Sequence, residues 1–253
     1  MLRISATPPM PVRVLDPAGA DYHRALTTFL ASTDQGQVAV EQLAAVIRRL
    51  PHRGLFVDAG AGDGATTSRL ARHFQRTVAI EPHALLREAC PQAELLPGAI
   101  AAVRPDEPAD LVLCSHVLYQ VPRRSWAETV RRMLGWLAEE GELVVVLRNP
   151  DSDCQRLVRH FTGVHLDLTE LRDELAHDGV EARIETLTSH VHTDTMADAV
   201  TVAEFLLNTA PLKELGAPDR RDLEVYLRRA FADYSGGFTL TSTQDFLHVR
   251  RAR

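Results

Sequence analysis

Three glycines and two aspartates share one short segment, VDAGAGDGAT. Gly60, Gly62 and Gly64 follow an apolar run typical of a strand and open a pattern typical of a helix. Glycines let a ligand approach the backbone, and the amides that begin a helix favour anions. Asp58 and Asp63 would nevertheless repel a pyrophosphate, because like charges disfavour one another. The turn therefore favours S-adenosylmethionine, which has a sulfonium, an amino group and a carboxylate but no phosphate.

A further acidic residue ends the next apolar run. Glu81 stands about 20 residues after Gly60 and is followed by Pro82. An acid at this place can accept hydrogen bonds from both ribose hydroxyls of an adenosine ligand, in NAD and in S-adenosylmethionine alike. The spacing Gly60-x-Gly62-x-x-Ala65 also satisfies the dinucleotide pattern, so an NAD(P)-dependent oxidoreductase stays open as an alternative.

The elements that would position these residues alternate between strand and helix. Apolar runs that are continuous, as in strands covered on both faces, predict a doubly wound and mostly parallel sheet of the α/β class. We expect strands at 55–58, 77–82, 93–98, 109–117 and 142–147, and helices at 65–75, 83–90 and 123–138. Two later strand patterns, at 182–192 and 238–250, predict an antiparallel edge with helices inserted between them.

The two ends of the chain differ from its centre. Residues 1–50 predict an N-terminal tail and a helical cap, in which two helical patterns are separated by the turn-prone sequence TDQG. This cap would act as a lid with TDQG as its hinge. Residues 51–253 would form the domain that binds S-adenosylmethionine, with a helical insertion at about 193–235.

Composition excludes several classes of protein. The net charge is −6, and the arginines form no basic stripe interleaved with aromatic residues, so a nucleic-acid partner is not expected. No apolar run reaches about 18 residues, which excludes an integral membrane protein. Cys90, Cys114 and Cys154 have no CxxC spacing, which argues for a reducing, cytoplasmic location. His190 and His192 have no third ligand at a recognisable spacing, so we expect no metal.

The motifs resemble those of a known class of enzyme. The Asp-x-Gly-x-Gly-x-Gly turn and Glu81-Pro82 resemble the first two motifs of class I S-adenosylmethionine-dependent methyltransferases, and ADLVLCSHVLYQVP and LAEEGELVVVL resemble their fourth and fifth strands. Within this class the chain resembles the histamine N-methyltransferase family, for example in LYQVP, VAEFLLNTA and TLTSTQDF. The resemblance implies a Rossmann-like methyltransferase fold with seven strands, of which the last is antiparallel.

The resemblance also implies roles for residues that bind the cofactor. Ser115 would contact it together with the glycine turn and Glu81. Where many methyltransferases have an acid for the adenine amino group, this chain has Ala99 and Ile100, so adenine would lie on apolar contacts. The expected cofactor-binding residues are Asp58, Gly60, Gly62, Glu81, Pro82, Ile100 and Ser115.

Acceptor-binding positions match the family only in part. The amine-binding carboxylate of the family falls at Asp34, its amide after the fourth strand at His116, and its asparagine on the last strand near Ser242. His116, with an ordinary pKa of about 6.5, would take a proton from an amine, or else would only line the strand end. Asp34 would orient the ammonium group. The expected substrate-binding residues are Tyr22, Asp34, His116, Tyr119 and Ser242.

Together these observations predict a methyltransferase that uses S-adenosylmethionine to methylate a small molecule. An amine nitrogen is the favoured acceptor atom, possible targets including a secondary metabolite, with oxygen and carbon as alternatives. The arginine-rich composition, with a single lysine, suggests a bacterial source. The enzyme would be a monomer or a homodimer. A methyltransferase-like binding subunit without turnover is a further alternative.

Overall fold

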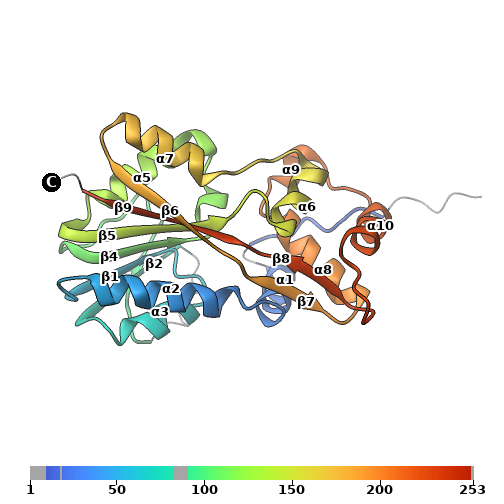
Figure 1. The fold of residues 1–253 in the computed structure, drawn as a ribbon, viewed down its shortest axis with the longest axis horizontal. Coiled ribbons are helices and arrows are strands. Elements are labelled where there is room, and N and C mark those ends of the chain that lie inside the picture. Colours follow the sequence, from blue (N-terminus) through green and yellow to red (C-terminus); the bar gives the residue numbers. More distant parts are fainter. Residues whose placement is uncertain (1–9, 18, 83–90, 252–253) are drawn as a thin grey trace, which may run out of the picture.

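A mixed sheet of seven strands lies at the centre of the chain (Figure 1). The computed structural model describes residues 10–17, 19–82 and 91–251. The strand order is β3-β2-β1-β4-β5-β9-β6, in which β3 to β5 are parallel and β9 is antiparallel to both neighbours. The strands are β1 (Leu55–Ala59), β2 (Arg76–Glu81), β3 (Glu94–Pro97), β4 (Ala109–Ser115), β5 (Leu137–Arg148), β6 (Glu181–Leu187) and β9 (Gln244–Arg250). The predicted doubly wound, mostly parallel sheet with an antiparallel last strand is confirmed.

The antiparallel strand does not lie where an antiparallel edge pair would put it. β9 is inserted between β5 and β6, so that Leu247 is opposite both Val145 and Ile184. Six of the seven residues of β9 are buried, whereas β6 has exposed residues along its length. The strand that is buried along almost its whole length therefore takes the inner place, and the more exposed strand forms the edge, although β9 contains the buried polar residues Gln244, Asp245 and His248.

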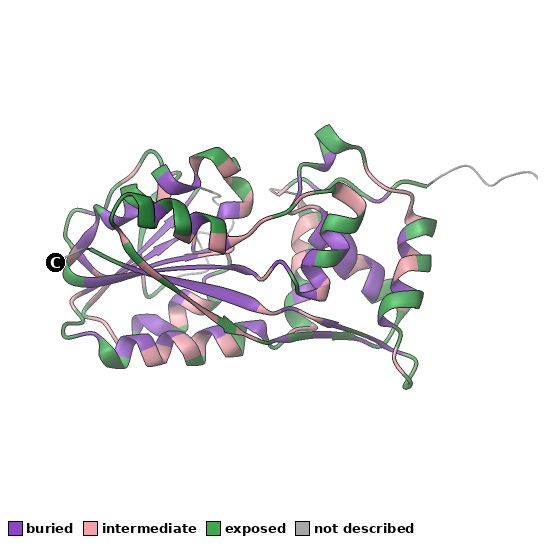
Figure 2. Cartoon of the chain, turned by 45° about the horizontal axis from the view of Figure 1, so that its top comes forward, coloured by how far each residue is buried: buried purple, intermediate pink, exposed green. Residues whose placement is uncertain are grey.

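Helices cover both faces of the sheet. On one face α2 (Gln35–Arg49) and α3 (Ala65–Ala71) pack with Leu43 and Ile47 against apolar strand residues such as Phe56 and Val144. On the other face α5 (Trp126–Leu134) and α7 (Leu168–His177) cover the remaining strand side chains, and Trp126 is fully buried there. Figure 2 shows that the strands are buried along most of their length.

A second lobe, made mostly of helices, lies beyond one end of the sheet (Figure 1). Its apolar core includes Phe29, Leu206 and Leu227, which come from three different helices. The lobe consists of α1 (Ala20–Ala31), α6 (Asp153–Thr162), α8 (Met196–Leu207), α9 (Leu212–Leu215), α10 (Arg220–Phe231) and the strand pair β7 (His190–Thr193) and β8 (Phe238–Thr241). The helices predicted between the last two strand patterns are thus α8, α9 and α10.

Two continuous chain segments join the lobes. β6 leads into β7, and β8 leads into β9 (Figure 1). β6 pairs with β9 and β7 pairs with β8, both in antiparallel orientation. At the junction the N–H of Ser242 donates to the carbonyl of Ser189 at 2.7 Å. The hydroxyl of Ser189 donates in turn to the carbonyl of Ser242 at 2.5 Å. The predicted strands at 182–192 and 238–250 are therefore each interrupted once.

The predicted cap is divided between the two lobes. α2 lies on the sheet, while α1 packs against α8 in the helical lobe. The TDQG segment, predicted as a hinge, is held to β7: Thr33 forms a bridge with Val191, and the N–H of His192 donates to the carbonyl of Ser32 at 2.8 Å. Because several backbone hydrogen bonds hold this turn to β7, the turn is bound to the helical lobe.

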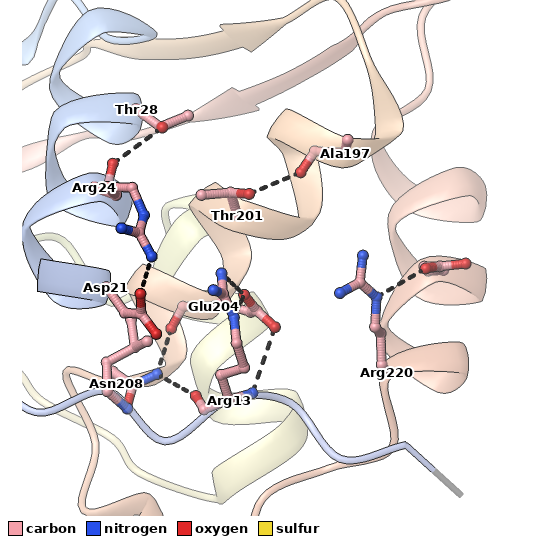
Figure 3. Close-up of polar contacts among 11 residues, drawn as sticks. Arg13, Asp21, Arg24, Thr28, Ala197, Thr201, Glu204, Asn208 and Arg220 are labelled. Carbon is pink, nitrogen blue, oxygen red and sulfur yellow. Dashed lines mark hydrogen bonds and ion pairs between the residues drawn. The ribbon is translucent and has the colours of Figure 1, made fainter. Parts of the chain in front are cut away.

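The chain before α1 is fastened to α8 (Figure 3). Arg13 donates to the buried carboxylate of Glu204 through Nε at 2.8 Å and Nη2 at 2.6 Å. The side-chain amide of Asn208 accepts from the N–H of Leu15 at 2.7 Å and donates to the carbonyl of Arg13 at 2.9 Å. The helical lobe therefore includes this N-terminal segment.

Two predicted boundaries differ from the structure. The helix expected over 123–138 is interrupted: after a 3-10 turn α5 ends at Leu134, and β5 already begins at Leu137. The segment after α5 pairs with β4: the N–H of Ala109 donates to the carbonyl of Trp136 at 2.8 Å, and Leu137 lies opposite Ala109. The helix predicted at 83–90 lies outside the described residues. Within the described ranges, no helix is long and apolar enough to cross a membrane.

Candidate functional site

One large cavity opens between the carboxyl ends of the parallel strands and the helical lobe. Its volume is about 1090 Å³. Ligands in sheets of this kind bind beyond the carboxyl ends of the strands, so the position is the expected one. Eleven of the residues singled out by sequence line it: Tyr22, Asp34, Asp58, Gly60, Gly62, Glu81, Pro82, Ile100, Ser115, His116 and Tyr119.

The glycine turn after β1 is held against β2. The N–H groups of Gly60 and Ala61 donate to the carbonyl of Ile80 at 2.8 and 3.2 Å. Gly60 has a φ of +104°, and a Cβ there would lie 2.2 Å from Cγ2 of Val117. Gly62 has a φ of +55°, but a Cβ there would meet nothing within 4 Å. Gly60 is thus required for space as well as for conformation, whereas Gly62 lies open to the cavity.

Glu81 reaches across this turn from the end of β2. Its Oε2 accepts from the N–H of Gly62 at 3.1 Å, and the residue is 5% exposed. Pro82, which follows it, is exposed at the rim of the cavity. The carboxylate of Glu81 therefore stands at the wall of the cavity, beside the open glycine.

Asp58 lies beneath the turn in a buried position. Its Oδ2 accepts from the hydroxyl of Thr67 at 2.6 Å. Burial raises the pKa of Asp58 to about 7, and the nearby carboxylates of Glu81 and Asp63 act in the same direction. A cationic group bound in the cavity would favour the charged form of Asp58, because opposite charges lower the pKa of an acid.

Ser115 and Ile100 complete the part of the cavity around the turn. Ser115 is the last residue of β4 and is half-buried. Ile100 is buried at the cavity wall, after Gly98, whose φ is +145°. The predicted cofactor-binding residues thus come together from the ends of three neighbouring strands and from the loop after β3.

His116 follows β4 in an unusual backbone conformation. Its φ is +59°, and its N–H donates to the carbonyl of Val146 at 2.9 Å. The ring stacks on Tyr119 with 5.8 Å between centroids, and the amide nitrogen of Gln244 donates to Nε2 at 3.0 Å. The neutral ring therefore carries its proton on Nδ1, which is buried and has no partner among the described residues. A non-glycine residue held at positive φ is a feature found at functional sites.

The surroundings of His116 oppose its protonated form. Burial, and secondly the positive charge of Arg148, lower the pKa of His116 to about 3. The ring is therefore neutral at ordinary pH and is a weak base. The sequence could not foresee this, since the burial depends on groups far along the chain.

Asp34 and Tyr22 line the cavity from the N-terminal helices. Oδ1 of Asp34 accepts from the N–H of His190 at 2.7 Å, and its side chain is half exposed. Tyr22 packs against Phe205 of α8 with 5.6 Å between ring centroids. Burial raises the pKa of the Tyr22 hydroxyl, and the nearby Arg148 opposes this rise. Asp34 thus also ties α2 to β7.

Ser242 does not line the cavity. It is fully buried at the junction of β8 and β9, where its hydroxyl donates to Oε1 of Gln35 at 3.3 Å. The residue of the last strand that does line the cavity is Gln244, two positions further on.

Arg148 is a cavity residue that the sequence analysis did not single out. It ends β5, is 3% exposed, and its N–H donates to the hydroxyl of Tyr119 at 2.9 Å. Its guanidinium carbon lies 5.2 Å from the ring centroid of Tyr119 and 5.5 Å from that of Phe29. Its place at the carboxyl end of the apolar run ELVVVLR was the available indication.

The described residues contain no group of three or more His, Cys, Asp or Glu side chains placed to hold a metal ion. His192 instead contacts Asp194 through Nε2 at 3.2 Å and Thr239 through Nδ1 at 3.0 Å, on the exposed β7–β8 pair.

A comparison with protein families finds a match that covers most strands of the sheet and the glycine turn. The model of a methyltransferase domain family matches residues 31–201, which is more than half of the chain. The match runs from the end of α1 into α8 and includes the glycine turn, Glu81, His116 and Arg148. No curated protein matches the chain, so the resemblance to histamine N-methyltransferases has no support from these comparisons.

Solved structures share the fold at low sequence identity. The YcgJ protein of Bacillus subtilis is 15% identical, with a TM-score of 0.58 over 84% of this chain and 99% of its own. A putative methyltransferase from Bacillus halodurans is 14% identical, with a TM-score of 0.59 over 85% and 99%. An S-adenosylmethionine-dependent methyltransferase from Geobacter sulfurreducens, in complex with S-adenosylhomocysteine, is 17% identical, with a TM-score of 0.50 over 84% and 90%. At these identities the likeness extends to the fold alone.

Proposed function

Because this chain belongs to the methyltransferase domain family and is an S-adenosylmethionine-dependent methyltransferase, we propose that it methylates a small molecule at an amine nitrogen. The observation that supports the proposal is that the glycine turn, Glu81 and Ser115 line the same cavity as His116, Tyr119 and Asp34. Family membership favours methyl transfer over the NAD(P)-dependent alternative.

The residues of the turn fit a cationic nucleoside donor. Gly62 is open to the cavity, and the carboxylate of Glu81 stands beside it. Buried Asp58 is at hand for a positively charged amino group, whereas two carboxylates so close together would oppose a pyrophosphate. We propose that Glu81 holds the ribose hydroxyls, that Ile100 packs on adenine and that Ser115 contacts the donor.

The chemistry requires alignment more than acid–base catalysis. The bound donor supplies a methyl group on a positively charged sulfur, which is released as a neutral thioether. A C–N bond forms with the amine lone pair as the C–S bond breaks, and the methylated nitrogen then gives up a proton to water. Holding the two partners in line and excluding water can supply about 7–11 kcal/mol of the rate enhancement. The cavity between the sheet and the helical lobe has room for both partners.

Neutral His116 favours an amine over an alcohol as the acceptor. With a pKa of about 3, its ring cannot take the proton of a hydroxyl group. An amine needs no such base once it is bound in its neutral form. Asp34, at the cavity wall, would then accept an N–H of the neutral amine.

The first test is binding and turnover with defined partners. We expect S-adenosylhomocysteine to bind the wild-type protein in titration calorimetry. Incubation with S-adenosylmethionine and paired acceptors that share a skeleton and an acid group, such as aminomethylbenzoates and the matching hydroxymethylbenzoates, should add one CH2 in mass to the amines only. Failure to bind S-adenosylhomocysteine would remove the donor assignment. Methylation of the alcohols instead would contradict the assignment of an amine nitrogen as the acceptor atom.

The donor assignment has its own variant. Glu81→Ala should weaken binding of S-adenosylhomocysteine by roughly 1–3 kcal/mol, the usual range for hydrogen bonds to a charged group. Glu139→Ala, which removes an exposed carboxylate of β5, serves as the control and should bind normally. An unchanged dissociation constant in Glu81→Ala would contradict the ribose contact.

A further inference from the structure

Arg148 is a buried cation that has no counterion among residues 10–17, 19–82 and 91–251. The residue is 3% exposed, and neither Nε nor Nη1 has a hydrogen-bond partner among the residues that the structure describes. Its only recorded side-chain contacts in that part of the chain are with the faces of two aromatic rings, those of Phe29 and Tyr119. Buried arginines are normally paired, because an uncompensated charge is expensive to remove from water.

Three acidic residues that line the cavity already accept hydrogen bonds from other groups. Asp58 accepts from Thr67, and Asp34 accepts from the N–H of His190. The carboxylate of Glu81 accepts from the glycine turn. No ion pair joins Arg148 to any of these acids or to another described residue. The charge of Arg148 is thus left to be balanced by something that enters the cavity.

Uncharged groups surround the guanidinium. Tyr119 and Phe29 lie against it, and its charge is felt at Tyr22 and at His116. His116 is neutral and presents an unpartnered N–H at Nδ1, next to the same Tyr119 ring. The cavity therefore combines one positive group, one further hydrogen-bond donor and aromatic walls. A planar carboxylate fits such a set, since a guanidinium fork binds it through two parallel hydrogen bonds.

We propose that Arg148 binds a carboxylate of the methyl acceptor, so that the substrate is an amine that also carries an acid group, with an aromatic or otherwise apolar body. This inference rests on the proposed function and deepens it. The binding carboxylate would offset the cost of the buried charge, and Arg148 would discriminate against acceptors that are only cationic.

The place of Arg148 in the sheet assigns it to the acceptor rather than to the donor. The predicted donor residues stand at the ends of β1, β2 and β4 and in the loop after β3. Arg148 ends β5, which lies on the far side of β4 from β1. It meets Phe29 of α1 there, beneath the helical lobe. The carboxylate of the donor itself is the competing occupant, and the experiment separates the two.

The test compares an acid with its neutral isostere. Thermal unfolding of the protein saturated with S-adenosylhomocysteine is followed while benzoate or benzamide is added, and the apparent affinities are taken from the rise in Tm. We expect benzoate to bind the wild-type protein at least tenfold more tightly than benzamide. This preference should vanish in Arg148→Met and persist in Arg132→Met, which removes an exposed arginine of the cavity rim. Arg148→Lys should keep only part of it.

Each contrary result has a distinct meaning. Equal affinities for the two probes, no stabilisation of the wild type by benzoate, or a benzoate preference that survives in Arg148→Met would overturn the inference. A tenfold loss of S-adenosylhomocysteine affinity in Arg148→Met, measured by calorimetry, would assign Arg148 to the donor carboxylate and overturn it as well. If S-adenosylhomocysteine does not bind the wild type at all, the proposed function itself fails.

The stability of the variant distinguishes binding from a structural role. Because Arg148 is an unpaired buried charge, its replacement by methionine of similar volume should leave the Tm of the ligand-free protein unchanged or higher. A large fall in that Tm would show that Arg148 stabilises the fold through contacts with Phe29 and Tyr119. In that case the preference for benzoate over benzamide is measured in Arg148→Lys, which keeps a positive charge on a long side chain.

Discussion

His116 shows how the surroundings of a residue change the chemistry that its type suggests. Its ring stacks on Tyr119 and accepts a hydrogen bond from Gln244, which stands 128 positions further along the chain. These neighbours bury the imidazole, and Arg148 adds a positive charge nearby. A residue that would ordinarily exchange protons near neutral pH is thereby kept neutral, and its role becomes one of hydrogen bonding.

A pH titration checks this role. Burial lowers the pKa of His116 from 6.5 to about 3, so the folded protein holds fewer protons than the unfolded chain between these values. The stability that depends on the neutral ring is present above pH 6.5 and is lost as the pH falls toward 3. We expect the His116 resonances in NMR spectra not to titrate between pH 5 and 8. We also expect His116→Asn to lose less stability than the wild type in that acidic range.

The same variant tests catalysis. If His116 is not the base, the pH profile of kcat in His116→Asn should keep its shape while kcat itself falls. A His116 resonance with a midpoint near pH 6.5, or an acid limb that disappears in the variant, would restore the role of a base that the sequence suggested.

Sequence alone could place most of the site but not its protonation states. Residues from Tyr22 to Tyr119 were recognised by type and spacing, and they line one cavity because parallel strands bring their carboxyl ends together. Arg148 also stands at the carboxyl end of a parallel strand, but it is part of no motif in the sequence. Its lack of an ion-pair partner can be seen only when the other cavity acids are found bonded elsewhere.

At the scale of elements, the glycine turn depends on the helix-like segment that follows β4. Gly60 lies against Val117, whose methyl group occupies the space that a side chain would need. The turn after β1 and the turn after β4 are therefore fitted to one another. The sequence identified Gly60 by its motif, but its packing partner is 57 positions away and could not be deduced from the motif.

Two matched alanine substitutions test this fit. Gly60→Ala combines a positive φ of +104° with a contact of 2.2 Å and should abolish detectable S-adenosylhomocysteine binding or lower the affinity at least tenfold. Gly62→Ala also adds a side chain at positive φ, but with no atom within 4 Å, so a cost of about 1 kcal/mol is expected. Titration calorimetry gives both values.

A rescue completes the comparison. Val117→Ala in the background of Gly60→Ala should restore part of the lost affinity, because it removes the colliding methyl group. Equal losses in Gly60→Ala and Gly62→Ala would mean that backbone conformation, and not the contact with Val117, determines the requirement for glycine.

The boundaries of elements were the weakest part of the sequence prediction. The strand β5 begins five residues earlier than its apolar run, and the segment before α5 forms 3-10 turns instead of a regular helix. The early start of β5 coincides with the pairing of Leu137 with Ala109 of β4. The apolar pattern determines that a strand is present, while its neighbours determine where pairing starts.

At the scale of the whole molecule, the cavity lies between two lobes that are joined at several points. Besides the paired strands, the turn between α1 and α2 is bonded to β7, and Asp34 takes part through its carboxylate. Asp34 thus has two possible functions, one in joining the lobes and one in binding the acceptor. The predicted cap could not reveal this, because β7 is more than 150 residues away in sequence.

Two substitutions at Asp34 separate these functions. Asp34→Asn keeps an oxygen that accepts from the N–H of His190, whereas Asp34→Ala removes it. We expect faster amide hydrogen exchange at His190 and His192 in Asp34→Ala only. Asp194→Ala, an exposed acid near the end of β7, is the control. If the charge of Asp34 binds the acceptor, both Asp34 variants should raise KM for an amine substrate.

The opposite pattern would be equally clear. Normal exchange in Asp34→Ala would mean that the bridge between Thr33 and Val191 holds the turn without the carboxylate. A normal KM in Asp34→Asn would limit Asp34 to its structural contact.

The crossing of Ser189 and Ser242 has a consequence for how such a chain can diversify. The N–H of Ser242 donates to the carbonyl of Ser189 at 2.7 Å, so the residues between these two serines leave the sheet and return to it at one place. The helices between them, α8 to α10, are thus inserted into the sheet at one place, but α8 also packs against α1 and binds Arg13 through Glu204. A change of length in this insertion would therefore have to keep the face of α8 that meets α1.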